Sequence, residues 1–255
     1  MPRIKHLKDR QFYHFINNKY GVSGYYPWET IPSMDLFLIA DAGLVMNGTS
    51  VSRWNNMARF PKTVSYANQT TPEYQPLLVA NQINGHNILR FTSASATRMS
   101  MDGTIICTTS ECYFGVIKRT GSYAIAFGNT SSAPADFAMM LAYRAVASGS
   151  LNLWSAGGAV GNSTWTNSNG WTSYQVIFLT CTALNTYTLT EDTTVLSPTT
   201  TVNGALTAKI NMIGGFAATS WLSDMDVACL GHMTTVPTTG EKETITNYLK
   251  TYYNL

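Results

Sequence analysis

Acidic side chains in this sequence do not form the pairs that hydrolysis of a glycosidic bond needs. Such hydrolysis uses two carboxylates about 5 to 9 Å apart, and a strand supplies them by an alternation such as Glu-x-Asp-x-Glu. No such alternation occurs, and Glu111 begins a predicted strand alone. We therefore expect no enzyme. The six glutamates are Glu29, Glu73, Glu111, Glu191, Glu241 and Glu243.

Nucleophile, metal and cofactor motifs are also missing from the sequence. Neither Gly-x-Ser-x-Gly nor a phosphate-binding Gly-rich motif with its Lys occurs, and the glycines of 157–161 lack a following helix. The four His show no ligand spacing, and no Cys-x-x-Cys is present. We expect His232 in a loop, and we expect no metal and no cofactor.

Aromatic rings beside amides are the remaining candidates for function. A Gly- and Ser-rich segment combines Trp154, Trp165, Trp171 and Tyr174 with several Asn. Exposed rings present flat apolar faces to sugar C–H groups, and amides donate to and accept from hydroxyls. The alternative is that Trp154 and Tyr174 belong to the core, with only Trp165 or Trp171 exposed. The predicted ligand-binding residues are Trp165, Trp171, Asn162, Asn167 and Asn169.

Other polar and sulfur side chains have structural interpretations. Asp41 and Asn55 carry oxygens suited to a hard cation, but such residues more often cap turns, which we favour here. The four cysteines, at 107, 112, 181 and 229, are expected as buried free thiols rather than as a disulfide framework. Trp54 and Trp221 are assigned to packing.

The strongest local pattern is a short helix at the C-terminal end. Thr238 or Thr239 can cap its start, and Glu241 and Glu243 lie in the first turn. Its apolar face is formed by Ile245, Tyr248, Leu249 and Tyr252.

The body preceding this helix reads as strands separated by Gly, Asn, Ser and Pro clusters. Short strands without helical patterns between them favour an antiparallel sandwich or jelly roll over a parallel α/β sheet. The sequence thus predicts an all-β fold with residues 1–32 as a basic, aromatic arm and linker and 33–255 as one domain. The expected strands are 36–39, 88–91, 113–118, 123–127, 138–143, 151–154, 174–181, 186–190 and 209–213.

The composition of the chain limits which partners it binds and where it is assembled. Only 12% of the 255 residues are charged, and the net charge of +2 is too small to favour a nucleic-acid partner. The first twenty residues lack the apolar core of a signal peptide, and no run is long enough to insert into a membrane. A low-charge β domain with a basic arm and no export signal is typical of a component assembled inside a cell. We therefore expect a virion protein, an oligomer whose residues 1–24 contact other virion subunits.

Two blocks of motifs resemble the LamG-like, concanavalin A-like superfamily. The closing helix follows the pattern Glu-x-x-x-Ile-x-x-Tyr-Leu-x-x-x-Tyr from Glu241 to Tyr253. Residues 41–42, 51–56, 75–79 and 83–91 follow, in order, Asp-Ala, Val-x-x-Trp-Asn-Asp, Arg-Pro-x-x-Val and Leu-Asn-Gly-x-x-x-Val-Arg-Phe. The resemblance implies a concanavalin A-like antiparallel β-sandwich, or jelly roll, with a short C-terminal helix. It says less about function, because one fold hosts many activities.

The sequence departs from that family at two positions relevant to a metal. The inner part of the last strand, 227–230, is wholly apolar where relatives often carry an acid, and Asn56 replaces the usual Asp. These departures leave open whether a calcium ion is bound.

Three functional hypotheses follow. The first is a non-enzymatic, virion-associated attachment module that recognises a host-surface glycan. The second is a purely structural capsid or tail decoration protein without sugar binding. The third, a glycoside hydrolase-like enzyme, is the least favoured.

Overall fold

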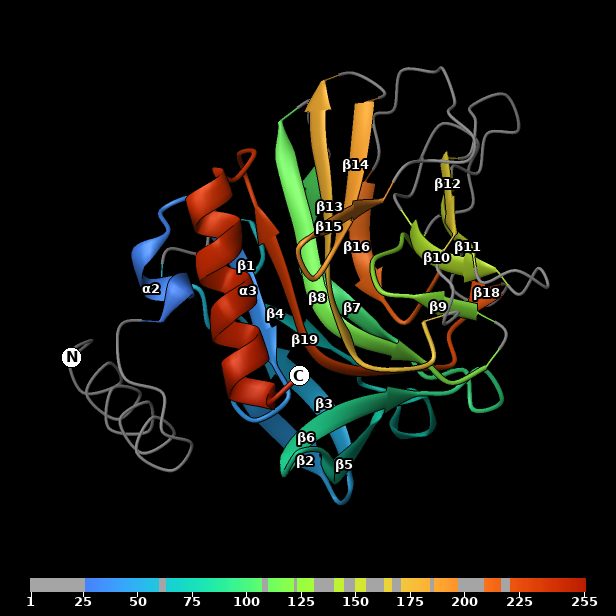
Figure 1. Ribbon diagram of the computed structural model, residues 1–255. Helices are drawn as coiled ribbons and strands as arrows, with labels where there is room; N and C mark the ends of the chain where they lie inside the picture. The colour runs from blue at the N-terminus through green and yellow to red at the C-terminus, as the bar shows by residue number, and fades with distance from the viewer. Residues whose placement is uncertain are drawn as a thin grey trace.

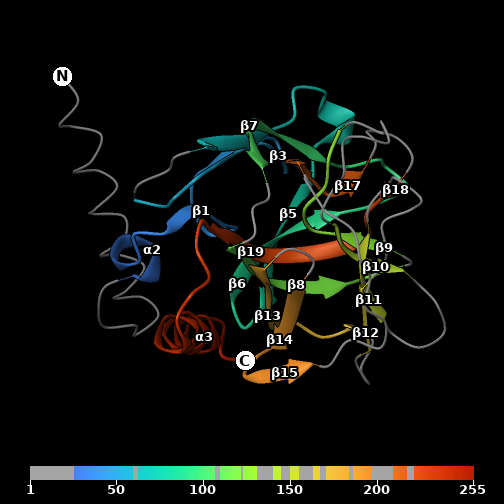
Figure 2. The same cartoon turned by 90° about the horizontal axis from the view of Figure 1, so that it is seen from above.

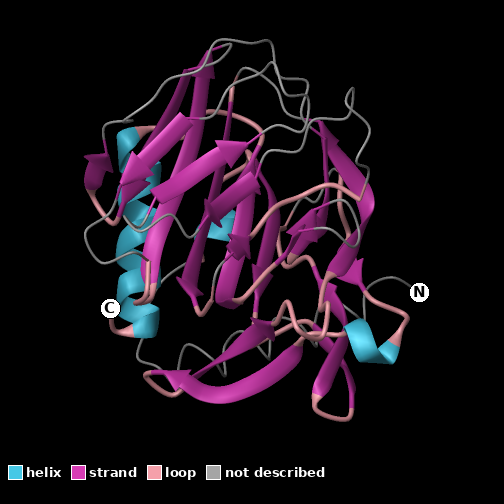
Figure 3. Cartoon of the chain, turned by 90° about the vertical axis from the view of Figure 1, so that its right-hand side faces the viewer, coloured by secondary structure: helices cyan, strands magenta, loops and turns pink. Residues whose placement is uncertain are grey.

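The computed structural model describes residues 26–59, 63–106, 110–121, 123–130, 140–144, 150–154, 163–166, 171–183, 186–196, 209–216 and 221–255. Two helices and one 3-10 turn accompany the strands of this part of the chain (Figures 1 and 3): α2 (Pro27–Thr30), η1 (Pro72–Tyr74) and α3 (Thr239–Tyr253). No helix among the described residues is long and apolar enough to cross a membrane.

The described strands are β1 (Met34–Ile39), β2 (Leu44–Asn47), β3 (Ser50–Asn55), β4 (Tyr66–Asn68), β5 (Leu77–Ile83), β6 (His86–Phe91), β7 (Met99–Ile106), β8 (Glu111–Arg119), β9 (Tyr123–Ile125), β10 (Met140–Arg144), β11 (Ser150–Trp154), β12 (Ser163–Thr166), β13 (Gln175–Ala183), β14 (Thr186–Glu191), β15 (Thr194–Leu196), β16 (Lys209–Ile213), β17 (Gly215–Phe216), β18 (Trp221–Leu222) and β19 (Met225–Met233).

The main sheet is one antiparallel path that folds over itself into two layers. Its order is β15-β14-β13-β8-β19-β6-β5-β3-β4-β7-β16, with β1 added at β19 and β2 at β3. The front layer contains β13, β8, β19 and β6, and the back layer contains β3, β4, β7 and β16. Figure 2 shows β3 and β7 on the opposite side of β8 and β19 from α3. A four-stranded sheet, β12-β11-β10-β9, lies beside these layers. The all-β sandwich predicted from the sequence is confirmed.

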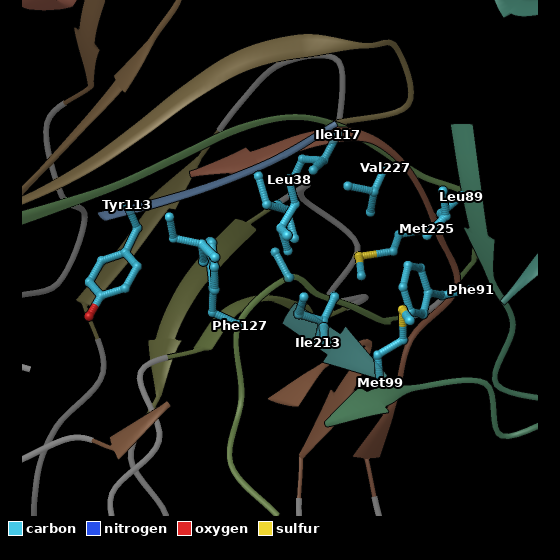
Figure 4. Close-up of a cluster of buried hydrophobic side chains, with 14 of the residues drawn as sticks. Leu38, Leu89, Phe91, Met99, Tyr113, Ile117, Phe127, Ile213, Met225 and Val227 are labelled. Atoms are coloured by element: carbon cyan, nitrogen blue, oxygen red, sulfur yellow. The ribbon is translucent and has the colours of Figure 1, made fainter. Parts of the chain in front are cut away.

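Two apolar clusters hold together the back layer, the front layer and the helix α3. The inner core lies between the two sheet layers and includes Met99 and Ile213 from the back layer and Phe91 and Val227 from the front layer (Figure 4). The helix-side core lies between the front layer and α3 and includes Phe114 with Leu249. The front layer is therefore buried on both faces, which explains why its strands read as nearly continuous apolar runs.

The helix α3 forms as its sequence predicts. Thr238 accepts a hydrogen bond from the Glu241 amide, and the Glu241 carboxylate accepts one from the Thr238 amide, which completes a capping box. The predicted apolar face is buried against the front layer. Asn254 ends the helix in the left-handed conformation.

The nine predicted strands correspond to β1, β6, β8, β9, β10, β11, β13, β14 and β16, with small differences at their ends. Strands without a counterpart in that prediction include β2, β3, β4, β5, β7, β12, β17 and β18, which are short or carry many polar side chains. The predicted linker contains the short helix α2, because Pro27 can occupy its first turn. Tyr26, Trp28 and Ile31 of this segment belong to the helix-side core. The arm through residue 25 lies outside the described residues.

A pair of glycine substitutions tests how tightly the inner core is packed. Gly214 has a φ of +86°, and a Cβ there would lie 2.3 Å from Cδ1 of Phe91. Gly48 has a φ of +62° but no atom within 4 Å of the same position. We expect Gly48→Ala to lower the free energy of unfolding by about 1 kcal/mol through backbone strain alone. Gly214→Ala adds overpacking, so we expect a loss of about 2 to 4 kcal/mol.

Chemical denaturation of both variants measures the difference. Equal losses for the two variants would show that the Phe91 ring moves aside without cost and that the core is looser than described.

Candidate functional site

The predicted ligand-binding segment is only partly covered by the structure. Trp165 lies in β12, where its backbone is paired with Leu151 of β11. Nothing is described of the Trp165 side chain, and Asn162, Asn167 and Asn169 lie outside the described residues. Their role in binding stays a prediction.

Trp171 does not present an exposed ring, which corrects the expectation for this residue. Its side chain is 3% exposed and belongs to the inner core. The residue adopts a left-handed backbone conformation, with a φ of 60°, just before β13. Its carbonyl accepts a hydrogen bond from the Arg119 amide at 2.8 Å, which fixes this turn beside β8. A ring buried in this way cannot stack on a sugar.

Trp54 and Tyr174 differ in how deeply they are buried. Trp54 is fully buried, and its indole N–H donates to the Ile39 carbonyl at 2.9 Å, so its assignment to packing is confirmed. Tyr174 is half-buried at the edge of the helix-side core. Nothing is described of the side chains of Trp154 and Trp221.

A buried carboxylate–imidazole–carboxylate cluster joins three neighbouring strands. His232 lies inside β19, opposite Leu36 of β1 and Tyr113 of β8, so its expected position in a loop is wrong. Its Nδ1 lies 2.6 Å from Oδ1 of Asp35 and its Nε2 lies 3.4 Å from Oε2 of Glu111. Glu111 is therefore not isolated, because the pairing of β8 with β19 places it beside the imidazole.

Burial and charge act in opposite directions on the His232 imidazole. Burial alone would lower its pKa, but the hydrogen bonds to Asp35 and Glu111, together with their charges, raise the pKa above the usual 6.5. His232, Asp35 and Glu111 are exposed by only 3%, 2% and 1%. The carboxylates thus favour the protonated form of the imidazole between them and are not open to a substrate.

A second buried network attaches the C-terminal end of α3 to the sheet. Oδ2 of Asp41 lies 2.8 Å from Nδ1 of His86 and accepts a hydrogen bond from the Tyr252 hydroxyl at 3.1 Å. Oδ1 of Asp41 accepts from the Asn87 amide at 3.0 Å.

Asn55 donates to the Gly43 carbonyl at 2.6 Å. Both residues considered as cation ligands are thus engaged in internal hydrogen bonds. In the part of the chain that the structure describes, no group of three or more His, Cys, Asp or Glu side chains could hold a metal.

A third buried acid, Asp226, lies at the start of β19 just before the apolar residues 227–230. Arg90 donates to both of its carboxylate oxygens, at 2.7 and 2.8 Å, and the Tyr174 hydroxyl donates to Oδ2 at 3.2 Å. The hydrogen bond to Asp226 raises the pKa of Arg90, so the guanidinium stays charged. The last strand therefore does carry an acid, but Arg90 and Tyr174 occupy both of its oxygens.

The described thiols are buried and inert. Cys112, Cys181 and Cys229 are free and buried, as predicted. Burial raises the pKa of Cys112 and of Cys229 to about 12. Because the thiolate is the reactive form, these residues carry no nucleophilic chemistry near neutral pH.

The outer face of the back layer presents a different set of groups, which we name the arginine–tyrosine face. It consists of Arg53 with Tyr66, Arg98 with Tyr74, and Asn68 with Ser100 between the two pairs. Register pairs Arg53 with Asn68 and Asn68 with Ser100 across β3, β4 and β7. The neighbouring register positions, Trp54, Ala67 and Met101, point into the inner core, so alternation places the strand residues of the face on the opposite side. Arg98 directly precedes the buried Met99 of β7, and Tyr74 lies in η1 under its guanidinium. All six side chains are partly exposed.

Each arginine of this face stacks on a tyrosine. The guanidinium carbon of Arg53 lies 3.6 Å from the centre of the Tyr66 ring, and that of Arg98 lies 4.3 Å from the centre of the Tyr74 ring. Stacking holds the guanidinium groups over the rings, and both arginine side chains stay partly exposed. The sequence did not reveal this face, although the alternation of polar and apolar residues in 99–102 is a signal once β7 is recognised.

Comparisons with known proteins identify the fold. Neither a protein-family model nor a curated protein matches the sequence. Among solved structures, Trypanosoma rangeli sialidase in complex with sialic acid aligns with 99% of this chain and 40% of its own, at 17% identity and a TM-score of 0.52. The binding domain of botulinum neurotoxin serotype D aligns with 85% of this chain and 51% of its own, at 10% identity and a TM-score of 0.54.

These likenesses establish a shared β-sandwich fold, and they do not establish a shared family or function. The chain spans about half or less of the length of each of these two proteins. One of them is an enzyme and the other a binding domain, so the function must be argued from the residues of this chain.

The imidazolium of His232 makes a testable contribution to stability. Because its pKa is raised in the folded state, this contribution is fully present below pH 6.5 and is lost as the pH rises through the folded-state pKa. We expect the free energy of unfolding to fall over that range, by at most about 1.4 kcal/mol per pH unit. A variant that neutralises the whole cluster, with His232→Gln, Asp35→Asn and Glu111→Gln, is expected to lack this slope.

Denaturant unfolding of both proteins between pH 6 and pH 9 gives the two stability curves, and their difference isolates the His232 cluster from the other titrating groups. Parallel curves would mean that His232 binds no additional proton in the folded state.

Proposed function

We propose that this protein is a non-enzymatic binding module that recognises a glycan. The observation that supports it best is the contrast between its buried and exposed polar groups. Asp35, Glu111 and Asp226, the most deeply buried acids of the described residues, are bound to His232 or Arg90. Rings, amides and cations lie instead at the surface of the back layer. This distribution suits recognition of a polar ligand more than acid–base chemistry on one.

The likeness in fold to a neurotoxin binding domain and to a sialidase is consistent with this proposal, but it is evidence for the fold alone. The predicted residues Trp165, Asn162, Asn167 and Asn169 provide one route to the sugar, through a flat ring flanked by amides. The composition and the basic arm extend the proposal to a virion-associated attachment protein whose residues 1–24 bind other subunits.

A glycan array with the full chain tests recognition. We expect binding to at least one glycan class, and we expect Trp165→Ala to weaken it by about tenfold, the usual minimum effect of removing an important contact residue. Trp165→Tyr keeps a ring and is expected to keep most of the binding. Thermal unfolding of each variant checks that the fold is intact.

Two results would contradict the proposal. No binding across a wide array would favour a decoration protein that binds no sugar. Release of sugar from a bound glycan would favour an enzyme.

Removal of residues 1–24 tests the proposed role of the arm. We expect the shortened chain to fold with an unchanged melting temperature, because Tyr26 and Trp28 of the helix-side core remain, but to fail to incorporate into particles. Removal through residue 32 serves as the control, since it deletes Tyr26, Trp28 and Ile31 and should lower the melting temperature. Normal incorporation of the shorter deletion would exclude the arm as the contact with other subunits.

A further inference from the structure

Arg53 carries a charge that forms no ion pair with any described residue. Its side chain makes no hydrogen bond and no ion pair with the described residues, and its Nε is buried without a partner. Leaving a buried donor of a charged group unpaired costs free energy. The side chain is also partly exposed, so a ligand carboxylate on the open part of this guanidinium would supply the missing counter-charge.

Arg98 of the same face also stacks on a tyrosine and forms no ion pair with the described residues. Its Nη1 donates to the Ala96 carbonyl at 2.8 Å, while its stacking on Tyr74 holds the plane of the guanidinium. No carboxylate of the described residues forms an ion pair with it. Two oriented cations therefore lie on one sheet face, separated by register positions of β4 and β7.

The groups between and around the two arginines limit what fits there. Asn68 and Ser100 lie between them and offer an amide and a hydroxyl, each able to donate and accept. Two acids are nearby in the fold. Asp102 lies beside Tyr66, but its Oδ1 accepts from the backbone amides of Ser65 and Tyr66. Glu73 lies exposed in η1 next to Tyr74.

We propose that the arginine–tyrosine face binds the carboxylate of an acidic glycan, with Arg53 as the principal contact. This inference rests on the proposed function and names its ligand class. A guanidinium presents a planar fork that matches a carboxylate in two parallel hydrogen bonds. Asn68 and Ser100 lie where sugar hydroxyls adjoining that carboxylate would come, and Arg98 meets a second acidic unit of the same chain.

An oligogalacturonide and its carboxyl-reduced, neutral counterpart are the probes, measured by titration calorimetry with the full chain. We expect the acidic oligosaccharide to bind and the reduced one to bind at least about tenfold more weakly, as expected for loss of hydrogen bonds to a charged group. Arg53→Gln is expected to show a similar loss. It breaks no internal hydrogen bond, so the fold should be kept, and thermal unfolding checks this.

Two further variants separate a specific fork from general attraction between charges. Arg53→Lys keeps the charge but not the planar fork, and we expect it to lose most of the affinity. Lys242→Gln removes one positive charge on α3, on the other side of the molecule, and should leave the affinity unchanged. Dextran sulfate is the second anionic probe and should bind more weakly than the oligogalacturonide.

The outcomes distinguish this inference from the function on which it rests. If Arg53→Lys binds like the unchanged chain, or if dextran sulfate binds equally well, the face is a general polyanion surface and the inference is wrong. If only neutral glycans bind, and Arg53→Gln leaves that binding intact, the module function stands and this site is refuted. If no glycan of either kind binds, both proposals fail.

Discussion

Strand β19 imposes the main constraint on this fold, because it is buried along its whole length on both faces. One of its edges is paired with β8, and the other is shared between β6 at the beginning and β1 at the end. Such a strand needs a cover on each side. The back layer supplies the inner core on one side, and α3 supplies the helix-side core on the other.

The same strand carries two ionisable groups that burial would otherwise make costly. Asp226 at its start is bound by Arg90, and His232 near its end lies between Asp35 and Glu111. A buried charge that loses its partner costs several kcal/mol, whereas an apolar pair of similar shape costs little. These networks are therefore better understood as fixing which strands lie next to β19 than as adding stability. They also explain why the acids most suited to chemistry by burial are unavailable for it.

Local patterns in the sequence were sufficient to predict α3 and most front-layer strands. Capping residues and apolar spacing act within a few positions of one another, so Thr238, Glu241 and the face from Ile245 to Tyr252 could be read directly. The cluster around His232 could not, since its partners lie 197 and 121 positions away in the chain. A bulge in β19 adds to the difficulty. Val227 and Leu230 both enter the inner core, so simple alternation fails between them. The burial of Trp171 is also not readable from local alternation, because this residue has a left-handed backbone conformation just before β13.

The two described ends of the chain meet on one side of the sandwich. Tyr26 packs edge-on against Tyr248 of α3, with ring centres 6.0 Å apart, and β1 runs beside β19. Figure 2 shows α2 beside α3 and level with β19, away from β3 and β7. The molecule consequently has a polarity. A segment joined to Tyr26 or to the end of α3 would tether the protein by the side that carries the helices. The outer surface of β3, β4 and β7 would then face away from the tether and stay open to a ligand.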